Sequence, residues 1–320
     1  MDKSERIEHR LKLHDLRVLM SVVDRGSMAK AAERLATSQP AVSRAIADLE
    51  YSLGVRLLDR GPRGVVPTPY GRALIRRGIA VFDELKQGVK DIEFLADPTA
   101  GEVRIGAPIA FAAGLVAAAT DRLARRHPHA VCYLMVGDDA MTYRALEERD
   151  LDAVITFFGA PIAEDHMQAE VLYAESRFVV AAIGNPWSRR RRVGLADLMK
   201  EPWTLPPRDS VLGSRIVNDF QVAGLDLPRA TVVSSNAVAR IALVAKGRFL
   251  TIASPSVLKF AGWDKAIKAL PIDLATTHGS VGIITLKNRT LTPMAQLFID
   301  CAREVAKPLA TGKSVSARRR

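Results

Sequence analysis

Apolar residues near the start of the chain recur at the three- and four-residue intervals of helices that each bury one face. One such pattern covers residues 13–23, a second covers residues 28–35, and a third covers residues 42–53. Spacing of this kind predicts three short helices that share a small core. Gly26 is expected to end the first helix, because glycine readily adopts the left-handed conformation that closes a helix.

Capping residues mark the second and third helices as a helix-turn-helix pair. Ser27 is expected to cap the second helix and Thr37 the third, because hydroxyl groups accept hydrogen bonds from free N–H groups at a helix start. Pro40 then falls in the first turn of the third helix, where its missing N–H has no consequence. The face of this helix opposite its apolar stripe is small and polar with one cation. It carries Gln39, Pro40, Ser43, Arg44 and Ala47.

That face has the chemistry needed to read bases in a DNA major groove. Glutamine can form two hydrogen bonds with an adenine edge, arginine can do so with guanine, and small neighbours allow close approach. The alternative, an ordinary solvated pair of helices, stays open on the pattern of these residues alone.

A change of period after Gly54 predicts a short β-hairpin, or wing. Residues 55–60 and 65–68 form its strands, and Gly61-Pro62-Arg63-Gly64 forms its turn. Arg63 at the tip is expected to enter a minor groove, and Arg60 is expected to reach a phosphate. A solvated surface charge is the alternative for either arginine.

A long helix is predicted to start at Pro69, with Thr68 as its cap, and to continue to about Leu95. An apolar stripe on so long a helix needs a partner, so we expect two copies of the chain to associate through it. Packing of the stripe against its own chain is the alternative. The stripe has near-heptad spacing and consists of Leu74, Gly78, Val81, Phe82, Leu85, Val89, Ile92 and Leu95.

Strands and helices alternate beyond the helix-breaking segment 97–101, and this order predicts a parallel sheet with helices on both faces. The strand patterns cover 103–107, 131–136 and 153–158, and the helical patterns cover 115–126 and 141–148. A second unit of the same kind is predicted from strands at 177–183, 203–205, 231–234 and 248–253 and helices at 214–223 and 237–245. A last strand at 281–285 and a last helix at 293–306 follow.

Composition and charge narrow the class of protein. The chain of 320 residues is 48% hydrophobic and 25% charged, as is usual for a soluble globular protein. It has no apolar run of about eighteen residues and no apolar segment near its charged start, so we expect cytoplasmic residence and no membrane partner. The net charge is +11, and every charged residue from Arg60 to Arg77 is basic, as phosphate neutralisation requires. Cys132 and Cys301 are expected to be reduced core residues.

Residues 13–77 resemble the winged helix-turn-helix of LysR-type transcriptional regulators. The resemblance rests on many spaced identities, among them Ala31-Ala32, Ser38-Gln39-Pro40-Ala41-Val42-Ser43, Leu49-Glu50 and Leu53-Gly54. The chain departs from the pattern at Leu58 and Tyr70, where the family often has phenylalanine and alanine. The resemblance implies a regulator that binds double-stranded DNA as a dimer or tetramer and works with RNA polymerase.

The rest of the chain is similar, more loosely, to the effector-binding domain of the same regulators, which itself resembles periplasmic binding proteins. The expected fold class is α/β, with an N-terminal winged helix-turn-helix, a long linker helix and a two-subdomain periplasmic-binding-protein-like effector domain. The expected boundaries are 1–68 for the winged domain, 69–97 for the linker helix, 98–306 for the effector domain and 307–320 for a basic tail. Subdomain I is expected at about 101–175 and 278–306, and subdomain II at about 176–277.

Ligands of doubly wound sheets bind at the carboxyl ends of strands, beside helix N-termini. Applied to both subdomains, this rule selects six candidate contacts to a small-molecule effector: Pro108, Ile109, Thr156, Ser210, Ser235 and Asn236. Ser235 and Asn236 are best placed to hold a carboxylate or hydroxyl group, with Thr156 facing them. Capping of the helix is the alternative role for Ser235. An organic acid, a sugar and an aromatic compound all remain open as effectors.

Catalysis is not expected, and neither is a cofactor or a metal. The chain has no GxGxxG, GxxxxGK[ST] or GxSxG motif, and its histidines lack metal-ligand spacing apart from His127 and His129, which we interpret as part of a turn. The predicted function is that of a sequence-specific DNA-binding transcriptional regulator controlled by a small-molecule effector. A small-molecule-binding protein without a regulatory role would leave the basic hairpin unexplained. An architectural DNA-binding protein would not need the α/β region.

Overall fold

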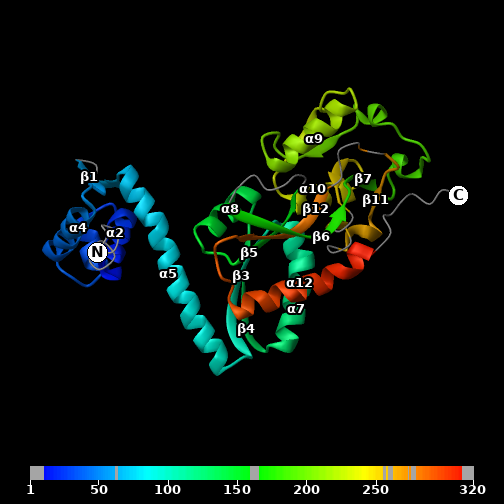
Figure 1. The fold of residues 1–320 in the computed structure, drawn as a ribbon. Coiled ribbons are helices and arrows are strands. Elements are labelled where there is room, and N and C mark those ends of the chain that lie inside the picture. The colour runs from blue at the N-terminus through cyan, green and yellow to red at the C-terminus, as the bar shows by residue number, and fades with distance from the viewer. Residues whose placement is uncertain are drawn as a thin grey trace. The chain divides into compact units, whose positions relative to one another are not determined.

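The computed structural model describes residues 11–61, 64–158, 166–254, 257–258, 262–272, 274 and 279–311. It divides into two compact units, residues 1–86 and 87–320, and the division falls within one long helix. Many elements of each unit are labelled in Figure 1.

Three helices form the core of the first unit: α2 (Leu13–Arg25), α3 (Met28–Arg34) and α4 (Gln39–Leu53). Gly26 ends α2 with a left-handed φ of 65°, as predicted. The cap of α4 was wrong by one residue, because Ser38 rather than Thr37 takes this position, and its Oγ accepts from the Ala41 N–H at 3.4 Å. Ser27 occupies the cap position of α3 without a side-chain hydrogen bond to the helix.

The predicted wing is present as the antiparallel pair β1 (Leu58–Gly61) and β2 (Gly64–Pro67). Its first strand starts later than expected, because Glu50 Oε1 on α4 accepts hydrogen bonds from the N–H groups of Leu57 at 2.7 Å and Leu58 at 3.2 Å. The N–H of Val65 donates to the Gly26 carbonyl at 3.0 Å, so the wing is fixed to the turn after α2. Pro62 and Arg63, at the predicted tip, lie outside the described residues.

The long helix α5 spans Pro69–Ala96 and is capped by Thr68, whose Oγ1 accepts from the Gly71 N–H at 3.1 Å. Gly78 allows the helix to lie close to α2, since a Cβ at this position would stand 2.9 Å from a methyl group of Leu16. Farther along α5, the predicted apolar stripe is exposed on the single chain. Val81 is 40% exposed, Leu85 50%, Val89 55%, Ile92 68% and Leu95 80%.

The second unit contains a five-stranded sheet with the order β4-β3-β5-β12-β6. The three predicted strands β3 (Ala100–Ala107), β4 (His129–Val136) and β5 (Ala153–Phe158) are parallel. The last strand, β12 (Gly279–Leu286), returns to this sheet and pairs antiparallel with β5. The expectation of an all-parallel sheet was therefore wrong at β12 and at β6 (Met167–Glu175), a strand that the sequence did not predict. Its glutamine and glutamates hide the strand pattern, and it lies at the sheet edge with most side chains exposed.

Helices cover both faces of this sheet, as predicted. Side chains of α7 (Ala117–Arg126) and α12 (Pro293–Thr311) enclose one core with Ile105 and Ile155, and those of α8 (Asp139–Glu147) enclose another with Val154 and Ile284. Residues 109–111, expected as a loop, form the short helix α6 (Ile109–Phe111), which runs through a π-helical turn (Ala112–Val116) into α7. Residues 307–311, expected in the tail, belong to α12, and residues 312–320 lie outside the described residues.

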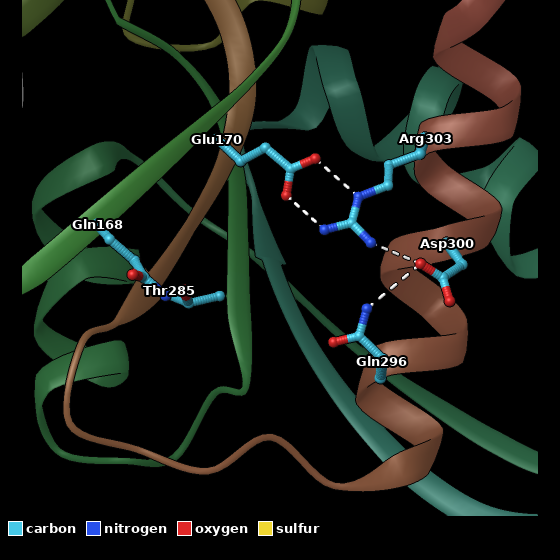
Figure 2. A network of polar contacts seen from close by, with 6 residues as sticks. All are labelled: Gln168, Glu170, Thr285, Gln296, Asp300 and Arg303. Carbon is cyan, nitrogen blue, oxygen red and sulfur yellow. Dashed lines mark hydrogen bonds and ion pairs between the residues drawn. The ribbon is translucent and has the colours of Figure 1, made fainter.

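A polar network holds α12 against the edge strand β6 (Figure 2). Arg303 on α12 donates from Nε and Nη2 to both carboxylate oxygens of Glu170 on β6, each at 2.7 Å, and from Nη1 to Asp300 at 2.5 Å. Gln296 donates to the same Asp300 oxygen at 3.2 Å. A bidentate pair with a supported guanidinium fixes the direction of α12 across the end of the sheet.

The remaining strands form two small sheets, β10-β7-β11 and β8-β9. Only β8 (Trp203–Leu205) and β9 (Ala230–Val233) pair in parallel, so the expected second all-parallel unit was wrong. The strands of the other sheet are β7 (Phe178–Ala182), β10 (Thr251–Ala253) and β11 (Ile267–Ala269), all antiparallel, and β11 was not predicted. The helices are α9 (Val211–Val222) and α10 (Ala237–Ala245), with short 3₁₀ turns at Pro186–Arg189, Leu195–Leu198 and Trp263–Lys265. Trp203 and Phe220 pack edge to face in the core.

Candidate functional site

The solvent-facing side of α4 is the candidate DNA-reading surface. Gln39, Pro40, Arg44 and Ala47 are exposed and Ser43 is half-buried. The opposite side of the same helix buries its valine, isoleucine and leucine in the three-helix core. The side chains proposed to read bases therefore stand on a rigid helix, and none of them is needed for the core.

Basic residues flank this surface on the wing and on the first turns of α5. Arg60 on β1 is exposed opposite Val65 of β2, and Arg76 and Arg77 are exposed on α5. Arg72 donates from Nη1 to the Pro67 carbonyl at 2.6 Å, which holds its guanidinium beside the end of the wing. Nothing can be added for Arg63, which lies outside the described residues.

Three of the predicted effector contacts lie at helix starts. Two of them cap a helix with their side chains, and the third is a proline directly before a helix. Ser210 caps α9, accepting from the Gly213 N–H at 3.0 Å and donating to the Pro207 carbonyl at 2.7 Å. Asn236, not Ser235, caps α10 by accepting from the Ala239 N–H at 3.1 Å. Pro108 precedes α6.

The helices α6 and α10 are neighbours in space. Ile109 is the first residue of α6, and α10 packs against this short helix. Ser235 is exposed in the loop before α10. The structure therefore brings the helix that follows Ser235 and Asn236 into contact with the short helix that follows Pro108, although the two helices follow strands of different sheets.

Thr156 faces a different group from the one expected. Its Oγ1, buried at the end of β5, donates to Asp139 Oδ1 on α8 at 2.7 Å. Burial raises the pKa of the Asp139 carboxyl, while this hydrogen bond and the positive charge of Arg215 oppose the rise. Asp139 is therefore a half-buried acid bonded to a buried residue of β5.

Two arginines that the sequence did not single out lie against Phe157, the next residue of β5. The guanidinium carbon of Arg177 is 5.2 Å from the centre of the Phe157 ring, and that of Arg215 on α9 is 5.4 Å from it. Arg177 is buried and pairs with the buried Asp219 at 3.6 Å. Burial lowers the pKa of Arg177 and raises that of Asp219. These contacts join β5 of the five-stranded sheet to α9 of the second subdomain.

Little in the sequence indicated that Arg177 and Arg215 would lie together beside Phe157. Arg177 is the first residue of the strand predicted at 177–183 and Arg215 lies in the helix predicted at 214–223, so the rule that selects the carboxyl ends of strands points to neither. Neither the pairing with Asp219 nor the position beside Phe157 follows from local pattern, because the first joins distant segments of the second subdomain and the second is a contact between the two subdomains.

Metal and membrane chemistry find no support in the described part of the chain. Its His, Cys, Asp and Glu side chains nowhere gather in threes as a metal site requires. None of its helices is both long enough and apolar enough to cross a membrane. Cys301 is buried and Cys132 is half-buried beside the same core, and burial raises the pKa of each thiol.

Comparison with known proteins covers both parts of the chain. Residues 13–72 match the family described as "Bacterial regulatory helix-turn-helix protein, lysR family". Residues 96–307 match the family described as "LysR substrate binding domain". The regulator GbpR of Azospirillum brasilense is 30% identical over 303 residues, 93% of this chain and 87% of that protein. The regulator PcaQ of Agrobacterium fabrum is 29% identical over 311 residues, 96% of this chain and 99% of that protein.

Solved structures share the fold at lower identity. A variant of full-length OxyR from Pseudomonas aeruginosa aligns with a TM-score of 0.66 and 22% identity, covering 93% of this chain and 97% of that one. Full-length CbnR complexed with its target DNA aligns with a TM-score of 0.61 and 22% identity, covering 92% of this chain and all of that one.

A winged helix-turn-helix followed by an α/β effector domain defines a DNA-binding transcriptional regulator that responds to a small molecule. The chain belongs to the LysR family of transcriptional regulators, whose members are not enzymes. The family, fold class and regulatory function predicted from the sequence are confirmed.

Proposed function

We propose that the exposed face of α4 reads the operator through Gln39, Pro40, Ser43 and Arg44, while Arg60 and Arg63 contact the flanking backbone and minor groove. The observation that carries this proposal is the separation of roles on α4, where one side forms the core and the other is exposed and presents small and polar groups, with Tyr51 near its C-terminal end. The boundaries 1–68, 69–97 and 98–306 are proposed for the winged domain, linker helix and effector domain. The protein is proposed to act in the cytoplasm and to contact RNA polymerase at the promoters it controls.

Replacing Arg44 tests the reading surface. We expect Arg44→Ala to weaken binding to the operator by about 1–3 kcal/mol and to relax the base preference at one position, because one bidentate base contact is lost. Binding to random DNA at the same salt concentration should change little. The measurement is a fluorescence titration with operator and random duplexes at several salt concentrations, and equal discrimination by the variant and the wild type would refute the role of Arg44.

The exposed stripe on α5 is proposed to join two copies of the chain, so that a dimer or tetramer presents paired copies of α4 to a two-fold operator. The stripe residues from Val81 to Leu95 are between 40% and 80% exposed, which is unfavourable for apolar side chains left in water. Association of two such helices would cover the stripe without change to either fold.

A charge in the middle of the stripe should separate the copies. We expect Val89→Lys to yield monomers in light scattering and to lower operator affinity about 100-fold, because two linked reading heads bind more tightly than one. Lys90→Glu, on the side of the helix opposite the stripe, is the matched control and should leave the assembly intact. An oligomeric Val89→Lys protein would contradict the proposed interface.

The effector is proposed to bind between the two subdomains, where Pro108, Ile109, Thr156, Ser210, Ser235 and Asn236 lie at strand ends or helix starts. Support comes from the contacts of α6 with α10 and of Phe157 with Arg177 and Arg215, which connect the subdomains. A molecule held there would bias the arrangement of the two subdomains, and thus of the oligomer on DNA.

A further inference from the structure

We infer that the effector is an anion and that the buried guanidinium of Arg240 neutralises its carboxylate or phosphate group. The inference deepens the proposed function and rests on it, because it names the chemical class of the molecule that the subdomains enclose. It starts from a difference among the buried arginines of the second unit.

Three arginines of this unit are buried: Arg177 is 4% exposed, Arg240 3% and Arg289 9%. Two of them are balanced by buried acids. Arg177 pairs with Asp219 at 3.6 Å, and Arg289 pairs with Asp152 at 3.1 Å. Arg240 has no acidic partner among the described residues, although it is the most deeply buried of the three.

The hydrogen bonds of Arg240 leave its charge uncompensated. Its Nη1 donates to the Ser234 carbonyl at 2.5 Å, and its buried Nε has no hydrogen-bond partner in the part of the chain that the structure describes. Burial lowers the pKa of Arg240 to about 10, so the side chain remains charged at neutral pH. A buried charge without a counter-ion is unfavourable, and a bound anion would supply both the opposite charge and the missing acceptor.

The position of Arg240 agrees with this role. Its guanidinium reaches the main chain of the loop that carries Ser235 and Asn236, at the carboxyl end of β9. The helix that bears it, α10, packs against α6, which begins after Pro108. Because β8 and β9 are parallel, the start of α9, with Ser210, follows the same edge of the sheet.

A neutral ligand would not supply the negative charge that the buried Arg240 lacks. A sugar could accept a hydrogen bond from Nε but would leave the charge of Arg240 unbalanced. A carboxylate or a phosphate accepts from the guanidinium in the forked geometry that arginine favours. These two groups share the chemistry that the site selects, and the probes described next distinguish them.

Thermal denaturation of the full-length protein tests the inference. The probes are benzoate, citrate, inorganic phosphate and glucose at millimolar concentration, with sodium chloride added to equal ionic strength. We expect a carboxylate or phosphate to raise the Tm of the wild type by several degrees and glucose to leave it unchanged. Arg240→Met should lose this shift, and without any probe it should melt at the same temperature as the wild type or higher, because an uncompensated buried charge has been removed.

Arg240→Lys keeps the charge but not the fork, so we expect it to bind the stabilising anion about tenfold more weakly than the wild type. Three results would overturn the inference. The first is an Arg240→Met protein whose Tm still rises when the anion is added, and the second is an Arg240→Met protein that melts well below the wild type while Arg240→Lys binds the anion as the wild type does. The third is a wild-type protein whose Tm is raised by glucose alone or by none of the probes. Salt-dependent binding of DNA by the same samples without probe tests the regulator separately. Loss of DNA binding would refute the proposed function, whereas intact DNA binding with no anion effect would refute only the role of Arg240.

Discussion

Gly71→Ala is expected to unfold or strongly loosen the winged domain and to abolish operator binding. A Cβ at this position would lie 2.1 Å from the Leu57 carbonyl oxygen and 3.3 Å from the side chain of Pro67. The Leu57 carbonyl cannot simply move away, because it also accepts from the Thr68 N–H at 2.9 Å. The main chain would have to shift at the point where the wing meets α5. Overpacking typically lowers the free energy of unfolding by about 1–3 kcal/mol, and we expect a clash with main chain to reach the upper end of this range or exceed it.

Urea denaturation followed by circular dichroism measures this effect, with operator binding as the second observable. The matched control is Ala73→Ser, an exposed position two residues farther along the same helix. We expect the control to stay within about 0.5 kcal/mol of the wild type. A Gly71→Ala protein with wild-type stability would show that the wing and α5 do not approach as closely as described.

Asp152→Ala is expected to lower the stability of the effector unit by about 3–5 kcal/mol, because it breaks a buried ion pair with Arg289 by removing one of its members. Asp152 Oδ1 lies 3.1 Å from Arg289 Nη2, and its other oxygen accepts from the Arg104 N–H on β3 at 2.8 Å. Arg289 also donates to the Leu151 carbonyl at 2.5 Å, so the pair joins β3, the start of β5 and the loop after β12.

The control for this prediction is a solvent-exposed pair of the same chemistry. Arg125 and Asp121 form an ion pair at 3.0 Å along one face of α7, with both side chains mostly exposed. Asp121→Ala should change the free energy of unfolding by about 0.5 kcal/mol or less. Equal effects of the two substitutions in calorimetry would show that the Asp152–Arg289 pair is not the buried junction described above.

Local pattern predicted the first unit well because its elements depend on neighbours in sequence. The wing followed from a change of period, and the cap of α5 followed from Thr68 and Pro69. The cap of α4 was displaced by one residue for a local reason that propensity does not reveal. Ala36 adopts a left-handed φ of 50°, the Thr37 N–H then bonds to Ala32, and the helix starts one residue later.

The effector region was predicted less completely, because its site depends on contacts between distant segments. The edge strand β6 has an unusually polar sequence, and the antiparallel pairing of β12 with β5 joins residues far apart in the chain. The sequence did contain a signal for Arg240, since it is the one charged residue within an apolar helix and lies on the same side as the buried Ile241 and Val244. That no acidic partner of Arg240 lies among the described residues, however, could be seen only in three dimensions.

The return of β12 to the first sheet has a consequence for synthesis on the ribosome. This strand lies between β5 and β6 but is more than a hundred residues later in the chain than either. The winged head can therefore fold while the middle of the sensing sheet has not yet been translated. A nascent or prematurely terminated chain would expose the edges of β5 and β6 that β12 later covers, and exposed strand edges carry a risk of aggregation. During synthesis the chain would also be able to bind DNA before it is able to bind the effector.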